Sequence, residues 1–148
     1  MVGNGCFGCG PNNHQGLAIK SYWQGGETHC QFQPEPHMSA GPPHFLNGGI
    51  IATVIDCHTV CTAAADAYRQ EGREIGDGET IWYVTGKLSI SYKAPAPISG
   101  PVDIKARISE RKGRKSVVEC ELFAGDTLCA TAEVIAIRVD PEWFTAPQ

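Results

Sequence analysis

The pattern of hydrophobic and polar positions separates one long apolar segment from several short alternating ones. Residues 48–68 are rich in Ile, Ala and Val and have no Gly or Pro in their interior, and this length predicts a helix rather than a strand. The segment is apolar on nearly every side as far as Asp66, which is typical of a helix enclosed by protein. Upstream, "GLAIKSYW" and "ETHCQFQ" predict two short strands that meet at the turn Gly25-Gly26.

Four further strands are predicted downstream of the helix, at residues 80–92, 102–110, 116–123 and 127–139. The segments that join them, "KAPAPISGP", "RKGRK" and "AGD", are short, and short connections favour antiparallel neighbours. We therefore predict a single α+β domain over residues 1–148, in which one central helix packs against an antiparallel sheet of five to six strands.

Alternation within residues 80–92, "TIWYVTGKLSISY", predicts which face of that strand meets the helix. One set of side chains is expected to face the helix: Trp82, Val84, Leu88, Ile90 and Tyr92. The other set is expected to face solvent or a partner subunit: Thr85, Lys87, Ser89 and Ser91.

Composition and charge narrow the class of protein. With 42% hydrophobic and 19% charged residues the chain is an ordinary globular sequence, and its net charge of -4 argues against a general nucleic-acid binder. The first residues, "MVGNGCFGCGPNNHQG", lack the features of a signal peptide, and no apolar run approaches the roughly 20 residues of a membrane span. We expect a cytoplasmic protein with no membrane partner, whose seven cysteines, an odd number, are reduced thiols.

One carboxylate, Asp56, lies within the apolar segment, and no basic residue occurs between Gly48 and Asp66 to pair with it. A carboxylate away from water has to be paired, hydrogen-bonded or shifted in pKa, which strengthens the case for a functional role. The alternative is that Asp56 faces a hydrated seam or caps a neighbouring loop.

The start of the helix offers a second candidate group. Gly48 and Gly49 leave the first backbone N–H groups uncovered at the positive end of the helix dipole, where a carbonyl oxygen that gains negative charge would be stabilised. Asn47 occupies the N-cap position, and capping is its structural alternative. Asp56 lies eight positions after Gly48, roughly 12 Å along the axis, so a site shared between two copies of the chain fits better than a site within one.

These residues resemble those of a known family. "NGGIIATVID" resembles the helix start of hotdog-fold acyl-CoA thioesterases of the phenylacetate-degradation and thioesterase-superfamily type, in which His-Gly-Gly precedes an Asp at this spacing. "VTGKLSISYKAPAP", "ERKGRKSVVECELFAGDTLCATAEVIAI" and "CFGCGPNNHQGLAI" are similar to the family's central strand, last two strands and start. The resemblance implies a helix wrapped by a sheet, a homodimer or homotetramer with active sites between subunits, and an acyl-CoA substrate. It implies no cofactor, because coenzyme A is part of the substrate.

The resemblance also implies roles for single residues. Asp56 would act as general base or nucleophile on the thioester, and the amide of Gly48, next to that of Gly49, would polarise its carbonyl. Thr85, seven residues before Tyr92, would position water or Asp56. As a hypothesis of our own, the basic turn, which we define as Lys112, Arg114 and Lys115, binds the phosphates of coenzyme A together with Lys93. The alternative is a solvated hairpin tip.

Asn47 departs from the family pattern, because it stands in place of the His and cannot titrate near pH 7. Any acid–base role of that His is therefore lost. A non-catalytic acyl-CoA or acyl-carrier binder and a hotdog acyl-CoA hydratase are the alternatives to a thioesterase. His44 and His58 are expected to be structural or exposed.

The cysteine spacing argues against a metal site. "CFGC" is half of a zinc or redox site, but no second pair follows it at metal-binding spacing. Cys57 and Cys61, one helical turn apart, are expected to be buried apolar thiols, and we predict no metal site.

Overall fold

The computed structural model describes residues 3–145 and places one long helix against six strands. Short helices flank these elements at η1 (Pro36–Met38) and α2 (Glu142–Thr145). The main elements are β1 (Tyr22–Gln24), β2 (Glu27–Phe32), α1 (Gly48–Gln70), β3 (Trp82–Tyr92), β4 (Val102–Lys112), β5 (Lys115–Ala124) and β6 (Thr127–Val139).

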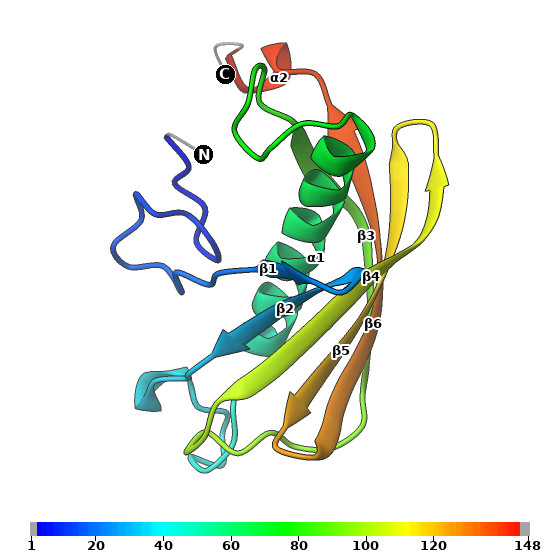
Figure 1. Ribbon diagram of the computed structural model, residues 1–148. Helices are drawn as coiled ribbons and strands as arrows, with labels where there is room; N and C mark the ends of the chain where they lie inside the picture. Colours follow the sequence, from blue (N-terminus) through cyan, green and yellow to red (C-terminus); the bar gives the residue numbers. More distant parts are fainter. Residues whose placement is uncertain (1–2, 146–148) are drawn as a thin grey trace.

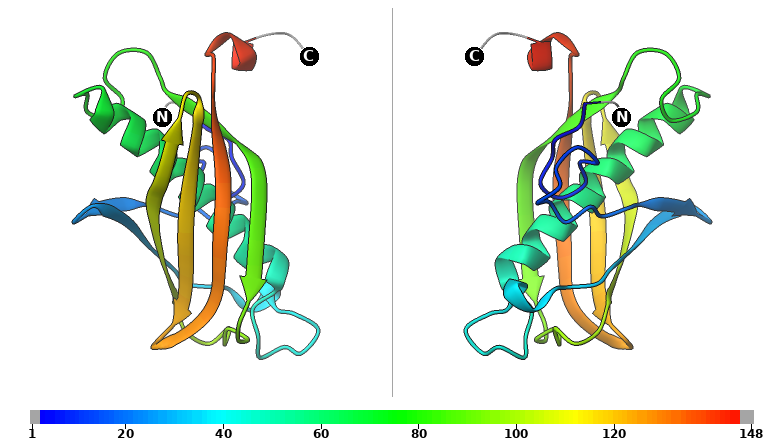
Figure 2. Two further views of the ribbon diagram at one scale, coloured as in Figure 1. Left: turned by 90° about the vertical axis from the view of Figure 1, so that its right-hand side faces the viewer. Right: turned by 90° about the vertical axis from the view of Figure 1, so that its left-hand side faces the viewer.

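The strands form one sheet in the order β1-β2-β4-β5-β6-β3, and every pair of neighbours is antiparallel. Helix α1 lies along the concave face of this curved sheet (Figure 1). Figure 2 shows the sheet in front of the helix in its left view and the helix in front of the sheet in its right view. The predicted α+β hotdog arrangement is therefore confirmed. Strand β3 lies at one edge of the sheet, which matters for the site described below.

The core forms between α1 and the inner face of the sheet, where apolar side chains of both elements meet. Val54 and Ile55 of α1 belong to the same fully buried cluster as Val118, Leu122 and Val134 of the central strands. Full burial of such a side chain contributes about 1.5–3 kcal/mol to the free energy of unfolding. The packed core thus fixes the position of the helix on which the candidate site is built.

Two buried polar side chains of α1 have partners on the sheet side of the helix. His58 is fully buried, with Nδ1 2.7 Å from the hydroxyl of Ser21 and Nε2 3.2 Å from that of Thr28. Desolvation lowers the pKa of His58 to about 4, so its ring is neutral near pH 7. Asp66 accepts two hydrogen bonds of 2.6 Å from the guanidinium of Arg111 on β4. The structural role expected for His58 is confirmed.

The expectation that no apolar run is long enough for a membrane span needs a correction. Helix α1 has 23 residues, and its most apolar window has a mean hydropathy of 1.4, so by length and composition alone it could cross a membrane. Half of that window is buried within the domain, and the core helix of a folded domain meets the same two criteria.

The predicted strand "GLAIKSYW" is the main error in element placement, because only Tyr22–Gln24 form β1. The N–H groups of Leu17 and Ile19 donate instead to the carbonyls of Phe7 and Gly8, at 2.7 and 3.0 Å, and Ala18 between them has a positive φ of 51°. The alternating pattern therefore reflects the contacts of Leu17 and Ile19 with Phe7 and Gly8. All four belong to what we call the N-terminal segment, residues 3–19. This segment crosses the middle of α1 on the side away from the sheet (Figure 2, right).

Candidate active site

Asp56 meets a single hydroxyl across the gap between α1 and β3. Its side chain is half-buried, and Oδ1 accepts a hydrogen bond of 2.5 Å from the hydroxyl of Thr85. A hydrogen bond to an ionised carboxylate is short and strong because the acceptor carries charge. The structure thus brings together two of the residues that the sequence singled out, and it orients one oxygen of the carboxylate.

Thr85 reaches Asp56 because of a β-bulge in β3. The pairing of β3 with β6 shifts register between Thr85 and Lys87, which leaves Gly86 as the extra residue. A Cβ atom on Gly86 would lie 2.5 Å from Cδ1 of Ile137, so a side chain there would have to displace its neighbour. A bulge of this kind reverses the facing of every residue beyond it.

The predicted side-chain orientation in β3 is therefore confirmed for the residues after the bulge and wrong for those before it. Leu88 and Ile90 pack against the core, as expected. Before Gly86, however, Tyr83 packs on the core and Thr85 points to α1, whereas strict alternation placed Trp82 and Val84 on that face and Thr85 on the other. The physical reason is the one extra residue, which alternation does not reveal.

Asp56 and Thr85 line a cavity of about 470 Å³, a size typical of small-molecule sites. Its walls are α1, the first half of β3 and the N-terminal segment, which contributes Cys6 and Cys9. None of the described lining residues is Lys, Arg or His. Among residues 3–145 the carboxylate therefore has no basic side chain beside it in the cavity, and its hydrogen-bond partner is a hydroxyl.

The start of α1 is closed by its own cap. The side-chain oxygen of Asn47 accepts a hydrogen bond of 2.7 Å from the N–H of Gly49, so the capping role considered for Asn47 is confirmed. The Gly49 amide is thereby used in the cap, and its contact with substrate stays a prediction. Among the hydrogen bonds of residues 3–145, none uses the N–H of Gly48. The Tyr92 hydroxyl donates to the Gly48 carbonyl at 2.7 Å and holds the helix start against the end of β3.

The helix start and the carboxylate belong to different hollows of one chain. Asn47 and Gly49 line a second hollow, of about 450 Å³, which shares no lining residue with the cavity at Asp56. This agrees with the separation of roughly 12 Å between Gly48 and Asp56 along the helix axis. One chain therefore does not place the Gly48 amide and the Asp56 carboxylate on the same small reacting centre.

The basic residues expected to bind phosphate are not grouped together. Lys112 and Lys115 are exposed and lie opposite each other in the strand register at the end of the β4–β5 hairpin. The Arg114 guanidinium donates to the Arg138 carbonyl at 2.9 Å. Lys93 follows β3 at the opposite end of the sheet. On β6, Lys115 lies opposite Ile137 and Tyr92 lies opposite Ala130. These two β6 positions are seven residues apart, which corresponds to roughly 23 Å along the strand. Within one chain the basic turn and Lys93 thus cannot bind the same phosphate.

Sequence reasoning missed several features near the site. Tyr92 was assigned only to the helix-facing set, although its hydroxyl fixes the start of α1. The N-terminal segment was expected to be a strand in part, and its role as a cavity wall had no signal in the hydrophobic pattern. His44 is exposed in the loop before α1, as expected.

The thiols beside the cavity influence one another. Hydrogen bonds from the thiols of Cys57 and Cys61 hold the pKa of Cys9 well below its usual range. The same hydrogen bonds, together with burial, raise the pKa of Cys57 and of Cys61. The expectation of burial is confirmed for Cys57 and wrong for Cys61, which is only partly buried. The Cys57 thiol is not isolated, because the fold places the sulfur atoms of Cys6 and Cys9 within 4.8 Å of it.

Comparison with known proteins identifies a family. A protein-family model described as "Thioesterase superfamily" matches residues 44–131, which is more than half of the chain. The acyl-coenzyme A thioesterase THEM4 of Xenopus laevis is 32% identical over 110 residues, which cover 74% of this chain and 43% of that protein. THEM4 of Mus musculus is 34% identical over 113 residues, with coverages of 75% and 43%. The chain thus spans less than half the length of these curated relatives.

A solved structure extends the similarity over most of the domain. A thioesterase superfamily protein from Shewanella loihica PV-4 is 35% identical and superimposes with a TM-score of 0.67, covering 82% of this chain and 91% of that one. The matched range 44–131 includes Asn47, Gly48, Asp56 and Thr85.

Proposed function

The chain belongs to the thioesterase superfamily, and we propose that it hydrolyses an acyl-CoA thioester to the free acid and coenzyme A. The observation that carries this proposal is the hydrogen bond between Asp56 and Thr85 inside a cavity without basic residues. Two relatives named acyl-coenzyme A thioesterase support the choice of substrate class.

Asp56 acts as general base on a water molecule, or as nucleophile, in the proposed reaction. Because Thr85 donates to Oδ1, the other oxygen, Oδ2, is free to accept a proton from water or to attack the carbonyl carbon. In the general-base form, the water oxygen bonds to the carbonyl carbon while its proton passes to Asp56. The tetrahedral intermediate then expels coenzyme A as a thiolate, which needs little acid assistance because the pKa of a thiol is about 8.5.

The N–H of Gly48 stabilises the oxygen that becomes negative in this intermediate. Its position at the start of a long helix adds the helix dipole to the hydrogen bond. Since Gly48 and Asp56 of one chain lie apart, the proposed site combines Gly48 of one subunit with Asp56 of another.

The edge of the sheet supports a two-subunit site. Within residues 3–145, strand β3 pairs with β6 on one side and with no strand on the other, although it is 11 residues long. An exposed edge of this length is a ready template for pairing with a second chain. Antiparallel pairing of two β3 strands would join the sheets of two subunits and place the helix start of each near the other's cavity.

The basic turn is the proposed contact for the phosphates of coenzyme A. The turn and the candidate base lie at the same height along the strands. Thr85 and Ser116, the neighbour of Lys115, are both register partners of Ala136 on β6. Lys93 of the same chain is too distant to take part, so a contribution from Lys93 would come from the second subunit.

A non-catalytic acyl-CoA binder is the second candidate. It is favoured by Asn47, whose side chain cannot titrate and is already used in the helix cap. The two candidates make opposite predictions for turnover.

The test is turnover of a panel of aryl, short-chain and long-chain acyl-CoAs. Release of coenzyme A is followed by chromatography, because the seven cysteines of the chain would react with thiol reagents. We expect turnover by the wild type and a decrease of about 100- to 10,000-fold in Asp56→Asn. Asp126→Asn, a matched change in the exposed turn between β5 and β6, should leave the rate unchanged.

Two results would contradict the proposal. Binding of acyl-CoA without turnover of any member of the panel would favour the binder. Equal rates for Asp56→Asn and Asp126→Asn would remove Asp56 from the mechanism. Sedimentation tests the shared site separately, since an active monomer would exclude it.

A further inference from the structure

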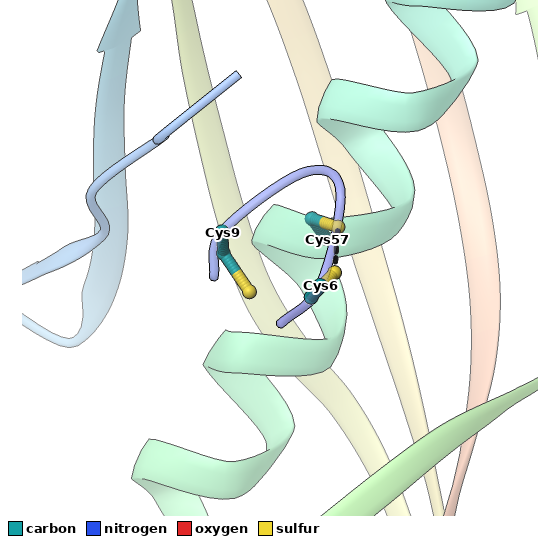
Figure 3. A group of neighbouring side chains, drawn as sticks. All are labelled: Cys6, Cys9 and Cys57. Carbon is teal, nitrogen blue, oxygen red and sulfur yellow. Dashed lines mark hydrogen bonds between the residues drawn. The ribbon is translucent and has the colours of Figure 1, made fainter. Parts of the chain in front are cut away.

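Four thiols from two distant parts of the chain meet at one wall of the Asp56 cavity. Cys6 and Cys9 belong to the N-terminal segment, and Cys57 and Cys61 belong to α1. The sulfur atoms of Cys6, Cys9 and Cys57 all lie within 4.8 Å of one another (Figure 3). Cys61, one helical turn after Cys57, lines the same cavity but lies outside this group of three. In the part of the chain that the structure describes, this is the one group of three metal-ligating side chains at such spacing.

The distances between the sulfur atoms fit a shared metal ion better than a disulfide. A tetrahedral zinc site has Zn–S bonds of about 2.3 Å, which gives sulfur–sulfur separations of about 3.8 Å. The separation between Cys6 and Cys57 is 3.5 Å, close to that value. A disulfide would require about 2.05 Å. The Cys6 and Cys57 sulfur atoms are therefore spaced like two ligands of one ion, and the Cys9 sulfur lies within 4.8 Å of both.

The backbone of the N-terminal segment is shaped to present its two thiols to the helix. The N–H of Gly10 donates to the Cys6 carbonyl at 2.9 Å and closes the turn that carries both cysteines, while the Asn4 side chain accepts from the Cys6 N–H at 3.0 Å. A Cβ atom on Gly8 would lie 2.1 Å from Sγ of Cys57, so only glycine allows this close approach. The turn is thus held against α1 at the point where the helix carries its own thiol.

The residue types select a soft cation. Thiolates bind Zn²⁺ strongly, and pairs separated by two to four residues are the usual arrangement in structural zinc sites. Cys6 and Cys9 are separated by two residues, and Cys57 and Cys61 by three. The two pairs are far apart in the sequence but adjacent in space.

We propose that Cys6, Cys9 and Cys57 bind one Zn²⁺ ion as thiolates, with Cys61 as the fourth ligand. Each coordinating thiol gives up its proton to solvent as its bond to the metal forms. The ion fastens the N-terminal segment to α1 and so fixes one wall of the cavity at Asp56. This site replaces the expectation from the sequence that the chain binds no metal, and it does not depend on the proposed hydrolysis.

Metal titration of the reduced, full-length chain tests the proposal. After treatment with a phosphine reductant and a chelator, the protein is titrated with ZnCl₂ against a chromophoric competitor, and with CoCl₂ to record the absorption spectrum. We expect one Zn²⁺ per chain and a cobalt spectrum with thiolate charge-transfer bands and the visible bands of tetrahedral coordination. MgCl₂, a hard cation, should not compete.

Matched variants show whether these thiols are the ligands. Cys9→Ser should weaken Zn²⁺ binding by more than about tenfold, since even loss of an outer-shell partner costs that much. Cys6→Ser is a second variant in case the first fails to fold, and circular dichroism checks both. Cys129→Ser is the control, because Cys129 lies in the core outside the cluster and its sulfur is close to the Pro95 carbonyl, to which a serine hydroxyl can donate.

A second measurement does not rely on affinity. Zn²⁺ should raise the midpoint of thermal unfolding of the wild type and of Cys129→Ser, and should leave that of Cys9→Ser unchanged. The proposal is overturned if Cys9→Ser and Cys129→Ser bind Zn²⁺ equally, or if cobalt gives an octahedral spectrum. It is also overturned if the fully reduced wild type binds no Zn²⁺.

Discussion

Replacement of Thr85 by valine isolates the hydrogen bond to Asp56. Valine has nearly the same shape as threonine but no hydroxyl, so Thr85→Val removes the donor at 2.5 Å and leaves the packing in place. A hydrogen bond to a charged group contributes about 1.5–3 kcal/mol. Because Asp56 is only half-buried, water can replace part of the interaction, so we expect the activation free energy to rise by about 1.5–2 kcal/mol. At 1.36 kcal/mol per factor of ten, kcat should fall about 10- to 30-fold.

The assay is steady-state hydrolysis of the acyl-CoA that turns over fastest in the panel, with coenzyme A followed by chromatography. We expect the loss in kcat and little change in KM, because Thr85 orients the base and does not bind the acyl group. Thr85→Ser retains the hydroxyl and should recover most of the activity. Thr131→Val is the matched control, since Thr131 lies on β6 and lines a groove on the outer face of the sheet.

Equal kcat values of Thr85→Val and Thr131→Val would contradict an orienting role of Thr85. This role is also refuted if Thr85→Ser is as slow as Thr85→Val, because the hydroxyl would then have no role. A change confined to KM would mean that Thr85 contacts the substrate instead of orienting Asp56.

Two further predictions concern the folded state. Burial lowers the pKa of His58 from 6.5 to about 4, so the contribution of its neutral ring is fully present above about pH 6.5 and is lost as the pH falls toward 4, by about 3 kcal/mol in total. The free energy of unfolding, measured with urea across this pH range, should fall in the wild type and not in His58→Gln. The same pH dependence in both proteins would contradict this role of His58. Asn47→Ala removes the cap on Gly49 and should lower the free energy of unfolding by about 1 kcal/mol, whereas Asn47→Asp should stay close to the wild type. Equal stabilities of these two variants would argue against the cap.

The sequence predicts the elements well where the deciding interactions are local. The long apolar segment predicted α1 at residues 48–68, against Gly48–Gln70 in the structure, and the strands after it begin and end within two residues of their predicted positions. Helical and strand periods and turn residues act over a few positions, which is why this information is present in the sequence.

Features that depend on distant residues were not predicted. Alternation placed Thr85 on the wrong face, because a bulge at Gly86 changes the register without changing the pattern on either side. Its position opposite Asp56 agrees with the family resemblance and not with the period. Likewise, the sequence gives no sign that the CFGC turn lies next to Cys57. Cys6 and Cys57 are 51 residues apart and meet only through the path of the N-terminal segment.

Strand β3 connects the two halves of the site within each subunit. Its first half bonds to Asp56 through Thr85, and its last residue bonds to the Gly48 carbonyl through Tyr92. In the proposed dimer, Asp56 and Gly48 of one chain serve different active sites, so each β3 is a rigid link between them. If a substrate shifts the helix start at one site, we expect β3 to transmit that shift to the base at the other site and to give a Hill coefficient that differs from one. A Hill coefficient of one would contradict this link.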